Sequence, residues 1–436
     1  MSGLSGLSGI RRPPVRALTF GVAARHPLAE EDVRAAAGLV QRAAESFAGE
    51  GYEVQTVRLS TRPVLSDLAG WDRKALVQYA CSLQEALDGA GIEFCSLGPA
   101  FPSDRPGGLD GLGGPAPQDG PAALADMLAG DVAGGDPPGT VAGTGAPGKG
   151  NTSLSASVMV TTREHGVDVA IARAAARAIL SLAGRTAQGL GNFNFAALGC
   201  VAPGTPFFPA AYHDGPASLA VALQGAGVVR EALAGGAELG GVEARTREKL
   251  TAAAHPVAAL AKRVAAKLGA TFAGIDLSPA PDVDDSIVGA LEGAGHGTFG
   301  GPGTLALAAA VTSGVRSTGL PMCGYSGLML PVMEDPVLAS RWDAGLVGID
   351  QLLAWSSVCG TGIDTVPVPG DAEPDLLAGI ICDMASLAAR LRKPLSARLL
   401  PAPGKVAGER TQFASPYLVN VLIKPLTPQA AISSPL

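Results

Sequence analysis

Residues 348–371 read GIDQLLAWSSVCGTGIDTVPVPGD and contain both kinds of element from which this chain is built. The first part, up to Val358, has the apolar spacing of a helix. The second part, residues 363–369, is rich in β-branched residues and is typical of a strand. Gly360 and Gly362 stand between the two, and glycine permits the sharp turn that joins a helix to a strand. The stretch therefore predicts one helix–turn–strand unit.

The same alternation recurs along the chain. Ten stretches have strand composition, at 15–23, 52–60, 92–98, 154–162, 193–200, 218–225, 271–278, 322–332, 363–369 and 394–401. Helical spacing is found at 27–49, 72–91 and roughly at 166–184, 240–269, 302–316, 348–357 and 374–392. Such repetition is typical of an α/β fold with a mostly parallel sheet, either open or closed.

Two segments interrupt this pattern. Residues 101–150 contain 14 glycines and 8 prolines, and PAALADMLAG is their one helix-like piece. We interpret this segment as an insertion, with a lid as the alternative. Residues 1–14, with their glycine–serine repeat, are expected to form a disordered leader. A single α/β barrel domain over 15–436 is the resulting prediction.

Composition excludes several classes of protein. The net charge of the 436 residues is −7, and no stripe of Lys or Arg indicates binding to nucleic acid. No apolar stretch reaches the roughly 18 residues of a membrane span. Six scattered cysteines are typical of a reducing, cytoplasmic protein. Neither cysteine nor histidine spacing predicts a zinc site, so the sequence identifies no cofactor, although a divalent cation stays open.

Two glycine clusters are candidates for anion binding. Gly225 and Gly227 lie between a strand and a helix, where helix N–H groups can approach a phosphate. Gly301, Gly303 and Thr304 open an alanine-rich helix in FGGPGTLALAAAV. The structural alternatives are a tight turn at the first cluster and close helix packing at the second.

Three carboxylates give a stronger indication of chemistry. Asp276 and Glu334 follow predicted strands, and Asp364 lies on the junction quoted above. The carboxyl ends of parallel strands meet at one edge of a sheet, so these groups are expected to converge as acid and base. Asp285 and Asp335 precede helical runs and are interpreted instead as helix caps.

A histidine and a cysteine complete the candidate site. His213 lies in PFFPAAYHDG, a loop before a strand, where it could relay protons. Cys359 lies at the start of the glycine junction and would be a nucleophile only as a thiolate. The alternative is that Cys359 packs in the core and the glycines only turn the chain. A phosphate cradle at the junction is the weakest interpretation, because no helix follows it directly.

Several of these stretches resemble one protein family. FGGPGTLALAAAVTSGVRSTGLPMCGYSGLMLPVMEDPVLASR, TFAGIDLSPAP and VCGTGIDTVPVPGD are similar to the DUF711 family, also called UPF0210. PFFPAAYHDG and QGAGVVREAL extend the resemblance, which leaves out 1–14 and 101–150. The shared motifs contain the predicted site residues, with Ser326 as a further polar member.

The resemblance implies a ten-stranded β/α barrel like that of the pyruvate formate-lyase glycyl radical enzymes. A TIM-like barrel and an open doubly wound sheet are the alternatives. The C-terminal region offers only PGKVAGERTQF, without a glycyl radical motif, and no adjacent cysteine pair occurs. Radical chemistry is therefore not expected. Fold kinship does not transfer an activity, and the family's own activity is not established.

Three hypotheses for function follow. The first is an enzyme of lyase, hydrolase or isomerase type that acts on a small carboxylate or carbonyl metabolite by acid/base or nucleophilic chemistry. The second is a module that binds an amino acid or related metabolite without turnover. The third is a scaffold that assembles through residues 417–426 (YLVNVLIKPL) as an exposed strand. A homodimer is expected on general grounds, since symmetric dimers are the commonest assembly.

Overall fold

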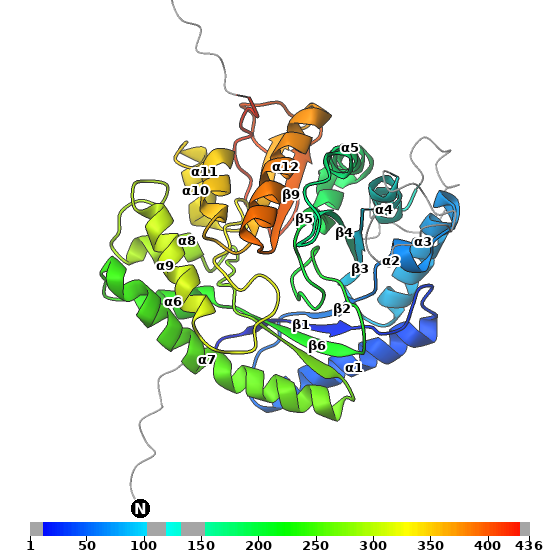
Figure 1. The fold of residues 1–436 in the computed structure, drawn as a ribbon, viewed down its shortest axis with the longest axis horizontal. Coiled ribbons are helices and arrows are strands. Elements are labelled where there is room, and N and C mark those ends of the chain that lie inside the picture. The colour runs from blue at the N-terminus through cyan, green and yellow to red at the C-terminus, as the bar shows by residue number, and fades with distance from the viewer. Residues whose placement is uncertain (1–11, 103–118, 132–152, 428–436) are drawn as a thin grey trace, which may run out of the picture.

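The structure is a computed structural model that describes residues 12–102, 119–131 and 153–427. Within these residues one sheet has nine strands in the order β7-β6-β1-β2-β3-β4-β5-β9-β8. The strands are β1 (Val15–Gly21), β2 (Val57–Ser60), β3 (Cys95–Ala100), β4 (Leu154–Thr161), β5 (Phe195–Gly199), β6 (Ser218–Leu223), β7 (Thr271–Asp276), β8 (Gly362–Pro369) and β9 (Leu395–Ala402). Figure 1 shows the sheet as a curved arc of strands with helices on its outer side.

The helices connect successive strands and cover the outer face of the sheet (Figure 1). They are α1 (Glu30–Gly49), α2 (Val64–Asp67), α3 (Arg73–Gly89), α4 (Gly120–Ala129), α5 (Val169–Arg185), α6 (Ala226–Leu233), α7 (Leu239–Lys267), α8 (Ile287–Gly293), α9 (Thr304–Arg316), α10 (Pro336–Asp343), α11 (Ile349–Ser356) and α12 (Pro374–Leu391), with a 3₁₀ segment η1 (Ala187–Asn194). All the predicted helices are confirmed, with small differences at their ends.

Nine of the ten predicted strands are confirmed, but the tenth is not. Residues 322–332 have no strand of their own and make two isolated bridges, Ile275 with Met322 and Pro331 with Asp364. These bridges contact both edges of the sheet, β7 and β8. The nine-stranded sheet is not closed by regular strand pairing, so the mixed α/β class is shown and the ten-stranded barrel is not.

The strands do not all run in one direction. β1 to β5 are parallel to one another, whereas β6 is antiparallel to β1 and β9 is antiparallel to β5. β7 follows the direction of β6, and β8 follows that of β9. The carboxyl ends of the strands therefore lie at two opposite ends of the sheet. No single edge of the sheet therefore collects the carboxyl ends of all nine strands, although β7 and β8, which carry Asp276 and Asp364, run in the same direction.

Two other predictions concern the ends and the insertion. The predicted strand at 417–426 is absent, and the one β-bridge of this region joins Leu422 to Arg410. The predicted leader lies outside the described residues except for its last three, and most of the insertion also lies outside them. The helix-like piece of the insertion is confirmed as α4. Among the described residues, no helix has both the length and the apolar character needed to cross a bilayer.

The hydrophobic core consists of two clusters. The larger cluster packs the outer face of the sheet against the helices. The smaller cluster lies on the inner face, where Ala196 and Leu198 of β5 point, while Phe195 and Ala197 belong to the outer cluster. This alternation follows from the two-residue period of a strand. The inner face is thus only partly apolar, which leaves room there for polar side chains.

The glycine junction between α11 and β8 turns the chain, as its composition predicted. Gly360 donates its N–H to Leu328 O at 2.7 Å. A Cβ on Gly360 would lie 2.7 Å from the carbonyl carbon of Gly327, so the two backbones touch. Gly362 has φ +98°, and a Cβ there would lie 2.4 Å from Ser396 O. The glycines are required for close backbone packing that aims β8 along β9.

One carboxylate joins the starts of two helices. Asp335 is fully buried, and its side chain accepts hydrogen bonds from the N–H groups of Val337 and Leu338 at the start of α10. It also accepts from Ser286 Oγ and the Val288 N–H at the start of α8. Its prediction as a cap is confirmed.

The corresponding prediction for Asp285 is wrong. The cap of α8 is the next residue, Ser286, whose hydroxyl accepts from the Gly289 N–H at 2.8 Å. Asp285 instead forms an ion pair with Arg230.

Replacing Asp335 by alanine should lower the free energy of unfolding by about 1–3 kcal/mol, because donors at two helix starts lose a buried acceptor. Asp72 caps α3 alone, by accepting from the Ala75 N–H, and it is exposed. Asp72→Ala is therefore the matched control, with an expected cost of about 1 kcal/mol. Urea unfolding measures both. Equal costs for the two variants would contradict the bridging role of Asp335.

Candidate functional site: an arginine pocket on the inner face of the sheet

A pocket of about 400 Å³ opens on the inner face of the sheet. It is lined by residues at or just before the amino ends of β1, β2, β3 and β5, by Asp282 after β7, and by side chains of β8 and β9. Its volume lies in the usual range for small-molecule sites. Six charged side chains line it, namely Arg16, Arg58, Arg398, Asp282, Glu334 and Asp364.

Arg58 is the cation of this pocket that lacks a carboxylate partner among the described residues. The residue is only 9% exposed, and its Nε donates to Thr56 Oγ1 at 2.9 Å. The guanidinium lies 4.9 Å from the ring centre of Phe94 and 5.3 Å from that of Phe208. Burial, followed by the charge of Arg16, lowers the pKa of Arg58. Among the described residues the terminal N–H groups of Arg58 make no hydrogen bond, and a buried guanidinium held by rings in this way can accept an anion.

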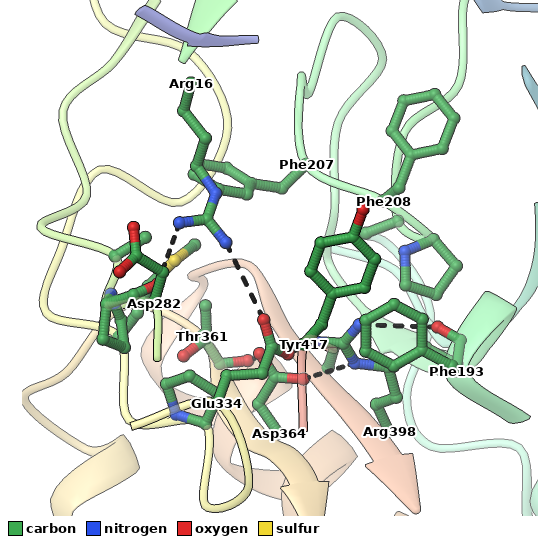
Figure 2. A pocket seen from close by; sticks show the side chains of 18 of the residues that line it. Arg16, Phe193, Phe207, Phe208, Asp282, Glu334, Thr361, Asp364, Arg398 and Tyr417 are labelled. Atoms are coloured by element: carbon green, nitrogen blue, oxygen red, sulfur yellow. Dashed lines mark hydrogen bonds and ion pairs between the residues drawn. The ribbon is translucent and has the colours of Figure 1, made fainter. Parts of the chain in front are cut away.

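Arg398 holds two acids together. Its Nε donates to Asp364 Oδ1 at 2.7 Å, and its Nη2 donates to Glu334 Oε1. All three side chains are nearly buried. Burial alone would lower the pKa of Arg398, but the charges of Asp364 and Glu334 outweigh this effect and raise it. Figure 2 shows the three groups together at the base of the pocket.

Glu334 has one carboxylate oxygen bound by Arg398 and a second oxygen without a close partner among the described residues. Its second oxygen, Oε2, lies 3.7 Å from Arg16 Nη2, a distance beyond a direct hydrogen bond. Arg16 makes closer contacts with Gln224 Oε1 at 2.9 Å and Pro281 O at 2.8 Å. Burial raises the pKa of Glu334, against the opposing charge of Arg398. A carboxyl group with these properties can take up and release a proton closer to neutral pH than an exposed one.

Aromatic side chains support the arginines. The chain has 11 Phe, 5 Tyr and 3 Trp, and six of these aromatic residues line the pocket. Phe193 lies 4.8 Å from the Arg398 guanidinium, and Phe207 lies 5.9 Å from that of Arg16. Each of the three arginines therefore faces a ring. Rings hold a cation without consuming its hydrogen-bond donors, which leaves those donors for a ligand.

Asp276 lies behind the pocket wall and not in it. It is fully buried, and its oxygens accept from the Tyr325 and Ser326 N–H groups at 2.7 and 3.1 Å and from Ser278. The Ser326 hydroxyl donates to Cys323 O, and Ser326 has φ +41°. Together these bonds fix the loop that presents the buried Tyr325 to the pocket. The catalytic role predicted for Asp276 and the binding role predicted for Ser326 stay predictions.

His213 and Cys359 also lie outside the pocket lining. The two ring nitrogens of the buried His213 contact Gly215 O and Ser218 Oγ, and burial lowers its pKa. Burial raises the pKa of the Cys359 thiol to about 12, and Lys393 Nζ binds the carbonyl of this residue and not its sulfur. The thiol thus stays protonated at neutral pH, the condition of a packed cysteine.

The two glycine clusters are also separate from the pocket. Gly301 and Gly303 precede α9, where the Thr304 hydroxyl donates to Gly301 O and accepts from the backbone. Gly225 caps α6, and a Cβ there would lie 3.1 Å from Pro279 Cα, while Gly227 lies inside that helix. Of the predicted site residues, the structure brings Glu334 and Asp364 together in the pocket.

The three arginines of the pocket are not among the residues predicted from the sequence. Each stands alone among apolar or small residues in a strand, in VRALTFG, VRLS and LSARLLPA. Arginine is rarely buried unless it has a partner, so a single arginine inside a buried strand indicates a site. This signal was available in the printed sequence. Among the described residues no three His, Cys, Asp or Glu side chains gather as a metal site requires.

Comparison with known proteins assigns the chain to a family. The family described as Uncharacterised ACR (DUF711) matches residues 149–417, more than half of the chain. The chain belongs to the DUF711 family. A UPF0210 protein of Pyrobaculum arsenaticum is 32% identical over 384 residues, which cover 84% of this chain and 78% of that protein. A UPF0210 protein of Methanopyrus kandleri is 31% identical over 431 residues, or 93% and 89% of the two chains.

The DUF711 match has a consequence for the pocket. Its range begins before β4 and ends at Tyr417, so it contains Glu334, Asp364 and Arg398. It leaves out Arg16 and Arg58, which belong to β1 and β2. The longer matches to the UPF0210 proteins of Pyrobaculum arsenaticum and Methanopyrus kandleri cover most of the chain. The family description names no activity.

Proposed function

We propose that this DUF711 protein binds a small organic anion of the carboxylate class in the arginine pocket and acts on it by acid/base chemistry. The observation that carries the proposal is Arg58, a buried guanidinium without a carboxylate partner among the described residues. Burying an unpaired charge costs free energy, and a bound anion would recover it. Arg16 and Arg398 lie beside the same space, where the charges of Glu334 and Asp364 balance theirs and leave Arg58 as the cation for an anion.

Glu334 is the group that we assign to proton transfer. It faces the pocket, and burial raises its pKa. With one oxygen held by Arg398, the other can take a proton from a carbon beside the carboxylate or carbonyl group of the ligand, or return it there. This chemistry belongs to lyases and isomerases. Asp364, held by the same arginine, would fix the orientation of that arginine.

Arg58→Met tests the anion site. The variant should bind carboxylates about 10- to 100-fold more weakly, since one charge-assisted pair contributes about 1.5–3 kcal/mol. Without ligand, it should unfold at a higher temperature than the natural protein, because a buried unpaired cation between two rings is replaced by an apolar side chain. Calorimetric titration and thermal unfolding with a panel of carboxylates measure the two effects.

Arg263→Met is the matched control for this test. Arg263 lies on α7 with its side chain 60% exposed, and it faces Glu50 at 3.9 Å. The same substitution there should change neither anion binding nor stability by more than about 0.5 kcal/mol. Unchanged carboxylate affinity in Arg58→Met would remove Arg58 as the anion site and with it the proposal.

A binding module without turnover is the second candidate, and one observation favours it. Arg398 already holds both Glu334 and Asp364 in ion pairs, an arrangement that stabilises a rigid binding pocket. Formation of a product distinguishes the enzyme from the binding module. A carboxylate that stabilises the protein and is converted, as followed by mass spectrometry, supports the enzyme. A carboxylate that binds and is recovered unchanged under all conditions supports the module.

A further inference from the structure

Tyr417 lies at the mouth of the arginine pocket. A small anion without an apolar group would bind the arginines and make no use of this aromatic side chain. The residue is 57% exposed, although it lines the pocket. Its ring lies parallel to that of Phe193, with an interplanar angle of 6° and centres 6.3 Å apart. Figure 2 shows the ring between Glu334 and Phe208, above Arg398. An exposed aromatic ring leaves apolar surface in contact with water, and a ligand that packs on the ring would remove that surface from water.

The loop that carries Tyr417 is firmly held on both sides. Asn420 Oδ1 accepts from the Thr411 hydroxyl and from the Phe413 N–H at 2.9 and 2.8 Å, and its Nδ2 donates to Phe413 O. The Val419 N–H donates to Met333 O at 2.7 Å. Phe413 is buried, so Tyr417 stays exposed within a loop whose neighbouring contacts are fixed. The exposure is therefore a property of the fold and does not reflect a loose segment.

The remaining aromatic residues of the pocket have other partners. Phe94 and Phe208 face Arg58, Phe207 faces Arg16, and Phe193 faces Arg398. Tyr417 lies close enough to Arg58 for the two side chains to interact electrostatically, but among the described residues its ring is not stacked on a cation. The Phe193 ring lies parallel to that of Tyr417, and the pocket lies beside both. Tyr325 is buried, and of the six aromatic residues that line the pocket Tyr417 is the one that is exposed, so its ring offers a surface to the ligand.

We propose that the ligand is a planar, conjugated acid whose flat group stacks on Tyr417 while its carboxylate binds Arg58. This inference rests on the proposed function, because it places the charged end of the ligand at the anion site. Stacked rings gain free energy beyond that of apolar burial alone. A saturated acid of equal size and charge lacks this gain. Tyr417 is accordingly a residue that sets specificity, and Arg58 one that sets affinity.

The test compares benzoate with cyclohexanecarboxylate, two acids with equal numbers of heavy atoms and equal charge. Their affinities for the full chain are measured by ligand-observed NMR at one salt concentration. Benzoate should bind about 3- to 10-fold more tightly, which corresponds to the usual gain from a stacked pair. Tyr417→Leu should remove this preference, whereas Tyr417→Phe, which retains the ring, should keep it. Circular dichroism confirms that each variant is folded.

The outcomes separate this inference from the proposed function. If both acids bind equally to the natural protein and Arg58→Met weakens both, the anion site stands and the planar ligand is refuted. If benzoate is preferred and Tyr417→Leu keeps that preference, the role of Tyr417 is refuted. If neither acid binds, both proposals fail together. A preference that disappears in Tyr417→Leu alone supports the planar acid.

Discussion

Replacing Arg398 by methionine should lower the free energy of unfolding by about 3–5 kcal/mol, the cost of removing one partner from a buried ion group. Arg398 is 7% exposed and binds Glu334 and Asp364 at once. Without its charge, two adjacent carboxylates would face each other in a space that water hardly reaches. Denaturant unfolding at pH 7 measures the loss.

The loss should depend on pH in a defined direction. The charge of Arg398 lowers the pKa of Glu334, so its removal should raise this pKa further above the unfolded value. A carboxyl group with a raised folded-state pKa stabilises the fold while it is protonated, and this contribution is lost as pH rises through the folded-state pKa. Arg398→Met should therefore be more destabilised at pH 8 than at pH 5. An equal loss at both pH values would contradict the assignment.

Two further variants separate the ion group from simple packing. Arg341 also forms a two-bonded pair, with Glu292 at 2.8 and 2.7 Å, but both side chains are partly exposed. Arg341→Met should cost about 1 kcal/mol or less, because solvent screens the pair. Adding Glu334→Gln and Asp364→Asn to Arg398→Met should recover most of the lost stability. No recovery would show that the arginine acts through its packing alone.

Replacing Glu334 by glutamine should reduce turnover of an accepted carboxylate by about 10²- to 10⁴-fold, the usual contribution of a general base. Glutamine retains the shape of the side chain and one acceptor for Arg398 but cannot take up a proton. The affinity for the carboxylate should change much less than the turnover, since in our proposal Arg58 makes the contact with the anion. Product formation is followed by mass spectrometry and binding by calorimetry.

The pH profile gives this test a second readout. Because burial raises the pKa of Glu334, activity that needs the ionised base should rise with pH through a pKa above the usual value of 4.5. This rise should be absent in Glu334→Gln. The matched control is Glu292→Gln, which removes the same charge at the Arg341 pair outside the pocket and should leave turnover unchanged. Full turnover in Glu334→Gln would exclude Glu334 as the base.

Local sequence patterns were sufficient for most of the secondary structure. The helices and nine strands follow from apolar spacing, which is a property of neighbouring residues. Residues 322–332 were mistaken for a strand because apolar side chains alone do not show where a segment pairs. The direction of each strand could not be predicted from local sequence either. β6 and β9 run antiparallel to β1 and β5, and this depends on connections and packing between distant segments. The hydrogen bonds that enclose Asp276 behind the pocket wall come from the loop at 325–326, and no pattern of neighbouring residues shows them.

The sequence by itself determined the α/β composition, the family resemblance and the turn at Gly360 and Gly362, because each depends on residues that lie close together in the chain. Only the tertiary structure decided that Arg58 lacks a carboxylate partner among the described residues while Arg398 has two. Both arginines occur in similar strand contexts, and no local pattern distinguishes them. Charge pairing in a buried pocket depends on which distant side chains lie together in the same low-dielectric space. The tertiary fold, and no local pattern, decides which side chains become neighbours there.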